Sequence, residues 1–278
     1  MTAAEDTTHP PHPPHLHGPG RPPAHPPRRF AGARRLGVAA VVFGAVGALV
    51  AFGVAGLDRG KLPGLGAEAA SGWEFPRLVK PPLPSGSPAP FAPGVDDPGV
   101  HHADLRALVL PAPAGAVEDA TLSGPKGWAD TDDFLTAYEE KDRAGLRQLL
   151  LDTGLRHIAA RGWTTPDGTR TRVYLLHFDT AAVVDDLFHQ HIAPAAAPGH
   201  QVRGAERAVP DEDLPDGSTV ADIRRSVYDE PRPHGAEHVR QGYLSAGDVL
   251  AVVLQSRRGT VGAIPFAQTL ALQSQLLG

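Results

Sequence analysis

A run of 22 residues without a charged side chain, Leu36 to Leu57, constrains this chain more than any other feature. It contains only Leu, Val, Ala, Phe and Gly. At about 1.5 Å per residue, a helix of this length extends about 33 Å, enough to cross a hydrocarbon core of about 30 Å. Lipid offers an exposed backbone no hydrogen-bond partners, so the segment must be helical. The sequence therefore predicts one transmembrane helix over residues 36–57.

Basic residues flank this span unequally. Arg28, Arg29, Arg34 and Arg35 precede it, and Arg59 and Lys61 follow it beside Asp58. The excess of arginine before the span predicts a plasma-membrane protein with a cytoplasmic N-terminus and an extracytoplasmic C-terminal region. A cleaved signal peptide is the alternative, but its apolar core is usually about 7–15 residues long and follows a shorter basic region. We therefore expect an uncleaved signal anchor.

Two proline-rich segments border the predicted helix. Residues 1–35 alternate His and Pro from His9 to His15, a pattern that cannot pack a core, so we expect a disordered cytoplasmic tail. Metal uptake by these histidines, or docking to a proline-reading partner, is the alternative to a solvated tail. Residues 58–100 are rich in Pro, Gly and Ala and predict a semi-stiff stalk. Residues 101–278 then form the extracytoplasmic domain.

Cysteine is absent, which excludes disulfides, a thiol nucleophile and a lipid-anchoring cysteine. Residues 58–278 carry 21 basic against 29 acidic side chains. This acidic balance argues against nucleic acid as a partner, because neutralising phosphates requires clustered Lys and Arg. The expected partners are the membrane itself and either an envelope protein or a small ligand.

The 101–278 region combines helical and strand patterns. Residues 155–164 and 170–178 predict a hairpin around Pro166-Asp167-Gly168, followed by a helix that begins near Thr180. Residues 239–244 and 249–255 predict a second pair of strands, followed by a helix from Pro265 to Leu277. The expected fold class is α+β, an antiparallel sheet with helices on one face.

Several short motifs are similar to those of streptomycete membrane-anchored proteins of unknown function. They are His102-Ala103-Asp104-Leu105-Arg106, Gly154-Leu155-Arg156-His157, Arg161-Gly162-Trp163-Thr164 and Tyr174-Leu175-Leu176-His177-Phe178. An excess of Arg over Lys agrees with such an actinobacterial source. More remotely, residues 102–278 resemble the extracytoplasmic sensor domain of mycobacterial serine/threonine kinases and small mycobacterial envelope lipoproteins. The cysteines expected of those sensor domains or lipid anchors are absent here.

Local catalytic and metal-binding motifs are missing from the sequence. There is no GxSxG, SxxK, Walker or HExxH pattern. His189 and His191 lie two residues apart, which places them on different sides of a helix, and Asp211-Glu212-Asp213 lacks the alternation of a calcium loop. We therefore expect no catalytic residues, no metal site and no cofactor.

Candidate ligand-binding residues are the aromatic Trp163, Tyr174 and Tyr243, as walls of a cleft on the sheet, and the basic pair Arg257 and Arg258. The alternatives are that the aromatic residues belong to the core and that the arginines mark a solvated strand end. The sequence predicts a membrane-anchored, non-catalytic extracytoplasmic domain that binds an envelope ligand or partner protein. A sensory subunit that signals to a cytoplasmic partner and, further away, an envelope hydrolase are the alternatives.

Overall fold

The domain is built around one antiparallel sheet. The computed structural model describes residues 72–278, except residues 97, 206 and 216–219. All of them belong to one compact unit, Arg59–Gly278. The eight strands follow the order β1-β3-β4-β8-β7-β6-β5, and β2 pairs with β3 outside this path. They are β1 Val117–Glu118, β2 Trp128–Ala129, β3 His157–Thr164, β4 Arg170–His177, β5 Val209–Pro210, β6 Ile223–Asp229, β7 His238–Ala246 and β8 Val249–Arg257. The predicted α+β class and antiparallel sheet are confirmed.

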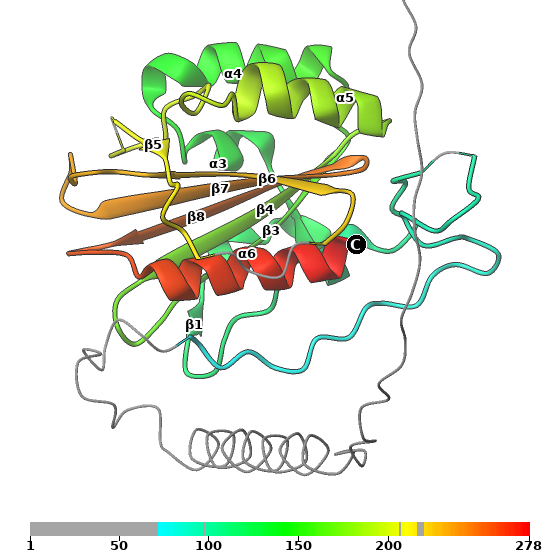
Figure 1. Cartoon of the computed structure of the whole chain (residues 1–278), viewed down its shortest axis with the longest axis horizontal. Helices are drawn as coiled ribbons and strands as arrows, with labels where there is room; N and C mark the ends of the chain where they lie inside the picture. The colour runs from blue at the N-terminus through cyan, green and yellow to red at the C-terminus, as the bar shows by residue number, and fades with distance from the viewer. Residues whose placement is uncertain (1–71, 97, 206, 216–219) are drawn as a thin grey trace, which may run out of the picture. The chain divides into compact units, whose positions relative to one another are not determined.

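Helices cover both faces of this sheet. They are α2 Leu105–Leu108, α3 Thr131–Leu135, α4 Glu140–Asp152, α5 Ala181–Asp186 and its π-helical continuation Leu187–Ile192, and α6 Ala263–Leu277. Short 3₁₀ turns lie at Ala120–Leu122 and Pro125–Gly127. Figure 1 shows α3, α4 and α5 on one side of the sheet and α6 on the other. The prediction of helices on one face is therefore wrong.

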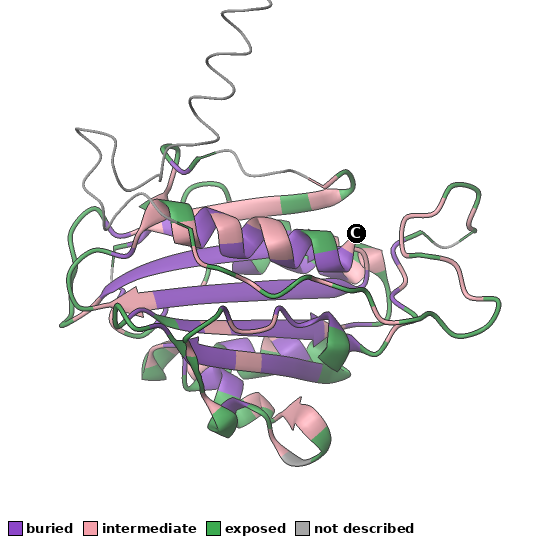
Figure 2. Cartoon of the chain, turned by 90° about the horizontal axis from the view of Figure 1, so that it is seen from below, coloured by how far each residue is buried: buried purple, intermediate pink, exposed green. Residues whose placement is uncertain are grey.

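The central strands explain why both faces need a cover. Val249–Leu254 in β8 is an unbroken apolar run, so this strand presents apolar side chains to both faces of the sheet. Val252 packs in the core beneath α3, α4 and α5, whereas Val253 packs with Phe266 and Leu270 of α6. Figure 2 shows the central strands buried along most of their length. Two hydrophobic cores thus lie on opposite sides of one sheet.

The predicted hairpin is confirmed. Strand β3 pairs with β4 from His157 opposite His177 to Thr164 opposite Arg170. Gly168 closes the turn with a φ of 84°, a left-handed conformation that favours glycine. The Thr180 hydroxyl then accepts a hydrogen bond from the Val183 amide and begins α5, as predicted. This local chemistry fixes the direction of β4, which carries part of the candidate site.

The proline-rich region before the domain packs against it from Gly72 onward. The Trp73 amide donates to Gln268 Oε1 at 2.7 Å, and the Phe75 ring lies edge-on to Trp163 at 6.3 Å between ring centroids. Phe75 and Leu78 contribute to the core on the α6 side. The folded unit therefore begins earlier than the expected boundary at residue 101, and the stalk remains a prediction for residues 58–71.

The predicted tail over residues 1–35 and the predicted membrane span over residues 36–57 lie outside the described residues. Within residues 72–278, apart from the gaps named above, no helix combines the length and apolarity needed to cross a membrane.

Candidate functional site

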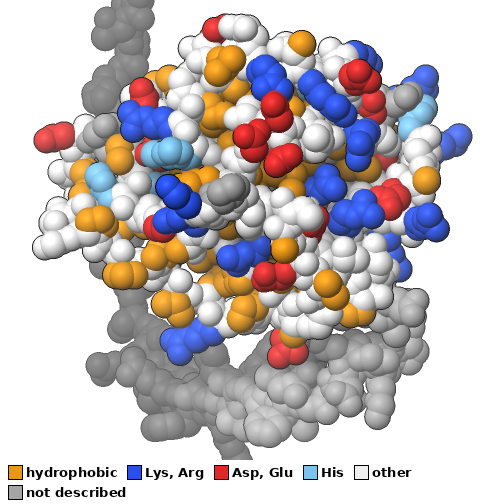
Figure 3. Space-filling model, turned by 180° about the vertical axis from the view of Figure 1, so that it is seen from behind, with side chains coloured by type: hydrophobic (Ala, Val, Ile, Leu, Met, Phe, Trp, Pro, Cys, Tyr) orange, Lys and Arg blue, Asp and Glu red, His pale blue; other side chains and the backbone are white. Residues whose placement is uncertain are grey.

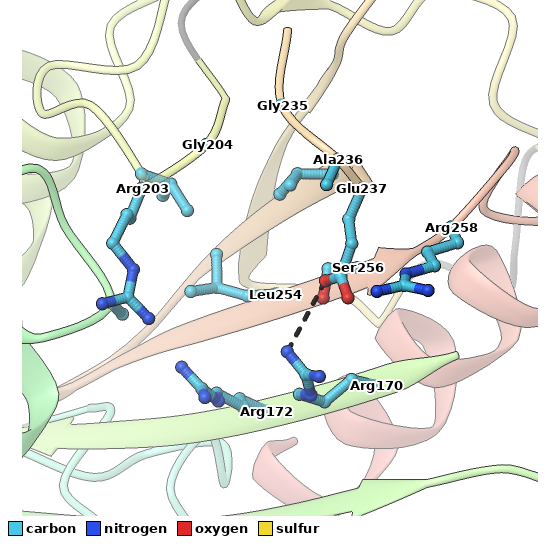
Figure 4. A pocket seen from close by; sticks show the side chains of 13 residues that line it. Arg170, Arg172, Arg203, Gly204, Gly235, Ala236, Glu237, Leu254, Ser256 and Arg258 are labelled. Atoms are coloured by element: carbon cyan, nitrogen blue, oxygen red, sulfur yellow. Dashed lines mark ion pairs between the residues drawn. The ribbon is translucent and has the colours of Figure 1, made fainter. Parts of the chain in front are cut away.

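A pocket of about 280 Å³ lies at one end of the sheet, on the side covered by α3, α4 and α5. It is formed by the ends of β4, β7 and β8 and by two loops, around residues 203 and 235. Its lining is Ala137, Arg170, Arg172, Val202, Arg203, Gly204, Gly235, Ala236, Glu237, Val239, Leu254, Ser256 and Arg258. Figure 4 shows these side chains surrounding one space from separate elements. A volume near the lower end of the range for ligand sites, about 300–1,000 Å³, suits a small molecule.

The strands form the floor of the pocket in two rows. In the first row, Ser256 of β8 lies between Arg170 of β4 and Val239 of β7. In the second row, Leu254 lies between Arg172 and Gln241. Because alternate residues of a strand face the same side, Arg170 and Arg172 point toward the same space. The sheet register therefore places two arginines together.

The two loops close the pocket from the side of the helices. The Arg203 amide donates to the Ala137 carbonyl at 2.9 Å, and the Gly204 amide donates to Glu139 Oε1 at 2.9 Å. Gly204 has a φ of 83°, which a residue with a side chain rarely adopts. A Cβ on Gly235 would lie 3.4 Å from the Gly204 carbonyl oxygen, so the two loops approach each other closely. These contacts hold Arg203 opposite the strand arginines.

Positive charge dominates the pocket. Among the described residues that line it are four arginines and one carboxylate, that of Glu237. Arg170 Nη1 lies 3.5 Å from Glu237 Oε2, the pair marked in Figure 4. Across the described part of the chain, the other three arginines form no ion pair: Arg172, Arg203 and Arg258. Unneutralised guanidinium groups around one space are suited to an anion, because their planar fork matches a carboxylate or phosphate.

Arg172 is the most enclosed of these cations. Its Nε atom is buried and has no hydrogen-bond partner among the described residues. The neighbouring Tyr174 hydroxyl is buried as well: burial raises the pKa of Tyr174 to about 12, and the charge of Arg172 opposes that rise. Tyr174 therefore stays a neutral phenol at physiological pH, able to donate and to accept hydrogen bonds.

The three aromatic residues expected as cleft walls lie inside the domain. Trp163 and Tyr174 have no exposed surface, and Tyr243 is 1% exposed. Tyr174 and Tyr243 pack beneath α3, α4 and α5, whereas Trp163 packs on the α6 side. The structure thus places all three in the core, the alternative considered from the sequence, and separates Trp163 from the other two by the sheet.

Arg257 and Arg258, the basic pair expected to bind a ligand, do not lie together in the structure. Arg258 lines the pocket. Arg257 is the last residue of β8, lies outside the pocket lining, and its Nη1 lies 3.4 Å from Asp167 Oδ2 of the β3–β4 turn. Adjacent residues at a strand end point in different directions, so a sequence pair does not make a spatial pair.

Sequence reasoning missed Arg170, Arg172, Arg203 and Glu237. A signal existed for Arg170 and Arg172, because they lie four and two residues before Tyr174 on the same face of β4, which is apolar further along the strand. Arginines on a face that is otherwise buried require a charged or polar counterpart. Arg203 and Glu237 lie in irregular segments and join the site only through tertiary contacts.

The histidines and carboxylates considered as metal ligands are dispersed. His189 Nε2 lies 3.1 Å from Arg224 Nη1, and His191 lies 4.0 Å from Asp186. Asp211 is paired with Arg240. Within the described part of the chain, no group of three His, Asp or Glu side chains is arranged to hold a metal ion.

The surface opposite the viewpoint of Figure 1 has a mixed character. In Figure 3, Lys and Arg side chains lie close to Asp and Glu side chains, with apolar side chains scattered among them. Such a mixed surface differs from the continuous basic stripe typical of nucleic-acid-binding proteins.

No family model matches this sequence, and no curated protein matches it. Among solved structures, the chain is similar to the extracellular domain of PknH from Mycobacterium tuberculosis, with 12% sequence identity and a TM-score of 0.33. The match covers 61% of this chain and 93% of that one. Function therefore has to be argued from the site itself.

Proposed function

We propose that this domain is a non-catalytic, extracytoplasmic module that binds a small anionic ligand in the arginine-lined pocket. The observation that carries the proposal is the convergence of Arg172, Arg203 and Arg258 on one pocket; none of the three is in an ion pair within the described residues. Like charges held together raise the free energy of the unliganded protein, and an anion relieves that repulsion. The surrounding acidic sequence makes an accidental gathering of arginines a poor explanation.

The composition of the lining supports binding without catalysis. Among the described lining residues, Ser256 carries the hydroxyl group and no histidine accompanies it. The carboxylate of Glu237 is engaged by Arg170. A serine nucleophile requires an adjacent base that is free to take its proton. The pocket offers donors for an anion and lacks the paired groups of a hydrolase.

A panel of ligands tests this proposal by thermal melting of the full chain in a non-ionic detergent. Phosphate, pyrophosphate and citrate are expected to raise the melting temperature saturably, and neutral sugars and Ca²⁺ to leave it unchanged. At 100 times the dissociation constant, a ligand stabilises by about 2.7 kcal/mol, which is several degrees for a domain of this size. Equal shifts in the wild type and in an Arg172→Gln variant would contradict the proposal.

Extracytoplasmic placement rests on the predicted membrane span at Leu36–Leu57 and the arginines before it. The absence of native cysteine allows a clean test, because one introduced thiol is the only thiol present. We expect a membrane-impermeant maleimide to label a Lys141→Cys variant on intact cells, since Lys141 is exposed on α4. A Thr8→Cys variant, in the predicted cytoplasmic tail, should be labelled only after lysis. The reverse pattern would invert the proposed topology.

A further inference from the structure

The inner surface of the arginine-lined pocket is apolar. Four of the lining residues belong at the same time to the hydrophobic core beneath α3, α4 and α5: Ala137, Val202, Val239 and Leu254. Each of them is buried but keeps between 4% and 6% of its surface exposed. Because these residues also line the pocket, the core opens into it, and a ligand in the pocket contacts core side chains directly.

The sheet register brings this apolar inner surface together with the arginines. Leu254 of β8 lies beside Arg172 of β4, and Val239 of β7 lies beside Ser256 in the neighbouring row. Val202 belongs to the loop that closes the pocket from the side of the helices. Figure 4 shows the Leu254 side chain in the middle of the space that the arginines surround. Charged and apolar side chains therefore share one pocket.

The two kinds of side chain lie at different depths. Arg170, Arg203 and Arg258 are exposed, whereas the four residues of the apolar inner surface are buried. The methylene groups of an arginine add further apolar surface beneath its guanidinium group. A molecule that enters the pocket thus meets positive charge at the mouth and aliphatic carbon at the inner end.

This arrangement complements an anion with an apolar body better than a small polyanion or a sugar. Aliphatic side chains offer no hydrogen bonds, so charged oxygens or hydroxyl groups held against them lose their water without compensation. An aliphatic group in the same position is stabilised, because its own surface and that of the pocket are both removed from water.

We infer that the ligand of the pocket is a short amphiphilic anion, with one acidic group on an aliphatic body of a few carbon atoms. This inference rests on the proposed function, because the acidic group binds between Arg172, Arg203 and Arg258. The aliphatic body lies against Val239 and Leu254, and the pocket volume of about 280 Å³ keeps it short. Phosphate and carboxylate both match the guanidinium fork, so the acidic group is either of these.

Calorimetric titration of the full chain in a non-ionic detergent compares inorganic phosphate with methyl, propyl and butyl phosphate. Each added methylene is expected to strengthen binding by about two- to fourfold until the pocket is full, because apolar surface is buried. Propyl phosphate should bind more tightly than glycerol 1-phosphate, which has the same carbon skeleton and charged group but carries hydroxyls. The alkanoates from acetate to pentanoate distinguish a carboxylate from a phosphate, and a rise with chain length in either series supports the inference.

Two controls separate binding in the pocket from general apolar association. 1-Butanol has the same carbon chain as butyl phosphate but lacks the acidic group, so we expect no measurable binding. Titration of each compound into detergent alone gives the heat of its partition into micelles, which is subtracted. Equal binding of 1-butanol and butyl phosphate would contradict the inference, because the chain would then bind without the arginines.

Two variants at neighbouring positions test where the aliphatic body binds. Val239 and Ser256 lie directly opposite each other on β7 and β8. Ser256→Val extends the apolar inner surface at a partly exposed position and should raise the ratio of butyl phosphate affinity to phosphate affinity severalfold. Val239→Thr keeps the shape of the side chain but adds a hydroxyl, so this ratio should fall severalfold. Val117→Thr is the matched control, because Val117 is 73% exposed in β1 and outside the lining, and it should leave the ratio unchanged.

The outcomes separate this inference from the proposed function. Val239 is part of the core, so the melting temperature of its variant is measured first, and Ser256→Val decides if Val239→Thr does not fold. Affinities that do not rise with chain length in either series would overturn the inference while the anion pocket stands. An unchanged ratio in Ser256→Val would overturn it as well, because the chain would then bind elsewhere. If phosphate, its esters and the alkanoates all fail to bind, the proposed function itself is wrong.

Discussion

Replacing Arg203 by alanine is expected to weaken pyrophosphate binding by roughly 10- to 100-fold, because a hydrogen bond to a charged group contributes about 1.5–3 kcal/mol. Arg203 is exposed and has no ion pair within the described residues, so its side chain contributes little to the fold. Its backbone amide keeps the bond to the Ala137 carbonyl in the variant. Titration calorimetry at fixed ionic strength measures the effect, and the melting temperature should stay within a degree or two.

Two further variants separate the role of Arg203 from total charge. Arg77→Ala removes an equal charge from an exposed position in the N-terminal segment and should leave pyrophosphate affinity unchanged. Arg203→Lys keeps the charge but loses the planar fork, so we expect an intermediate affinity. Equal weakening by Arg77→Ala and Arg203→Ala would show that pyrophosphate responds to net charge, which contradicts binding in the pocket.

Replacing Asp248 by alanine is expected to destabilise the domain by about 3–5 kcal/mol, because it removes a buried carboxylate that accepts several hydrogen bonds and leaves their donors without a partner. Asp248 lies in the β7–β8 turn, and its side chain is 2% exposed. The His101 ring Nδ1 lies 2.6 Å from one carboxylate oxygen and the His101 amide donates to both, while His177 Nε2 lies 3.3 Å from the other oxygen. The carboxylate thus connects the N-terminal segment, the β7–β8 turn and the end of β4.

A melting curve at neutral pH measures the loss, which should amount to roughly 6–20 °C for a domain of this size. Asp213→Ala, which removes a carboxylate from an exposed loop, serves as the control and should change the melting temperature by less than about 2 °C. A similar small change in Asp248→Ala would show that the His101 contacts do not stabilise the domain.

Acid is expected to destabilise the wild-type domain by protonating Asp248. Burial tends to raise the pKa of Asp248, but the hydrogen bonds from His101 and His177 outweigh it and lower the pKa to about 2. The pKa of Asp248 in the folded protein thus lies below that of an ordinary aspartate, which is near 4. The carboxylate therefore contributes its full stabilisation above about pH 4, and this contribution is lost as the pH falls through about 2. Wild-type stability should therefore fall between pH 4 and pH 2 more steeply than that of Asp248→Ala.

Much of the fold could be predicted from local patterns. Alternation in residues 170–178 predicts which side chains of β4 face each core, and Gly168 and Thr180 mark a turn and a helix start that the structure confirms. These signals succeed because they depend on neighbouring residues alone. The prediction that the helices lie on one face was wrong, because the apolar run in β8 indicates burial but does not say which helix covers which side of the sheet.

The candidate site was less predictable, because it depends on distant contacts. His101 directly follows the predicted stalk, a position that indicates an exposed side chain, yet it is buried against Asp248, 147 positions away. The pocket joins Arg203 of a loop to Arg172 of a strand through the bridge between Tyr138 and Val202. No pattern in a single sequence encodes such a pairing, so only Arg258 was identified in advance.

The most direct test of an anion site in this pocket is a crystal structure of the full chain grown with selenate, using the anomalous signal of selenium. The account predicts a selenium peak between Arg172, Arg203 and Arg258, with selenate oxygens within hydrogen-bond distance of at least two of the guanidinium groups. A pocket without selenate, in a crystal where the ion occupies other positions, would contradict it.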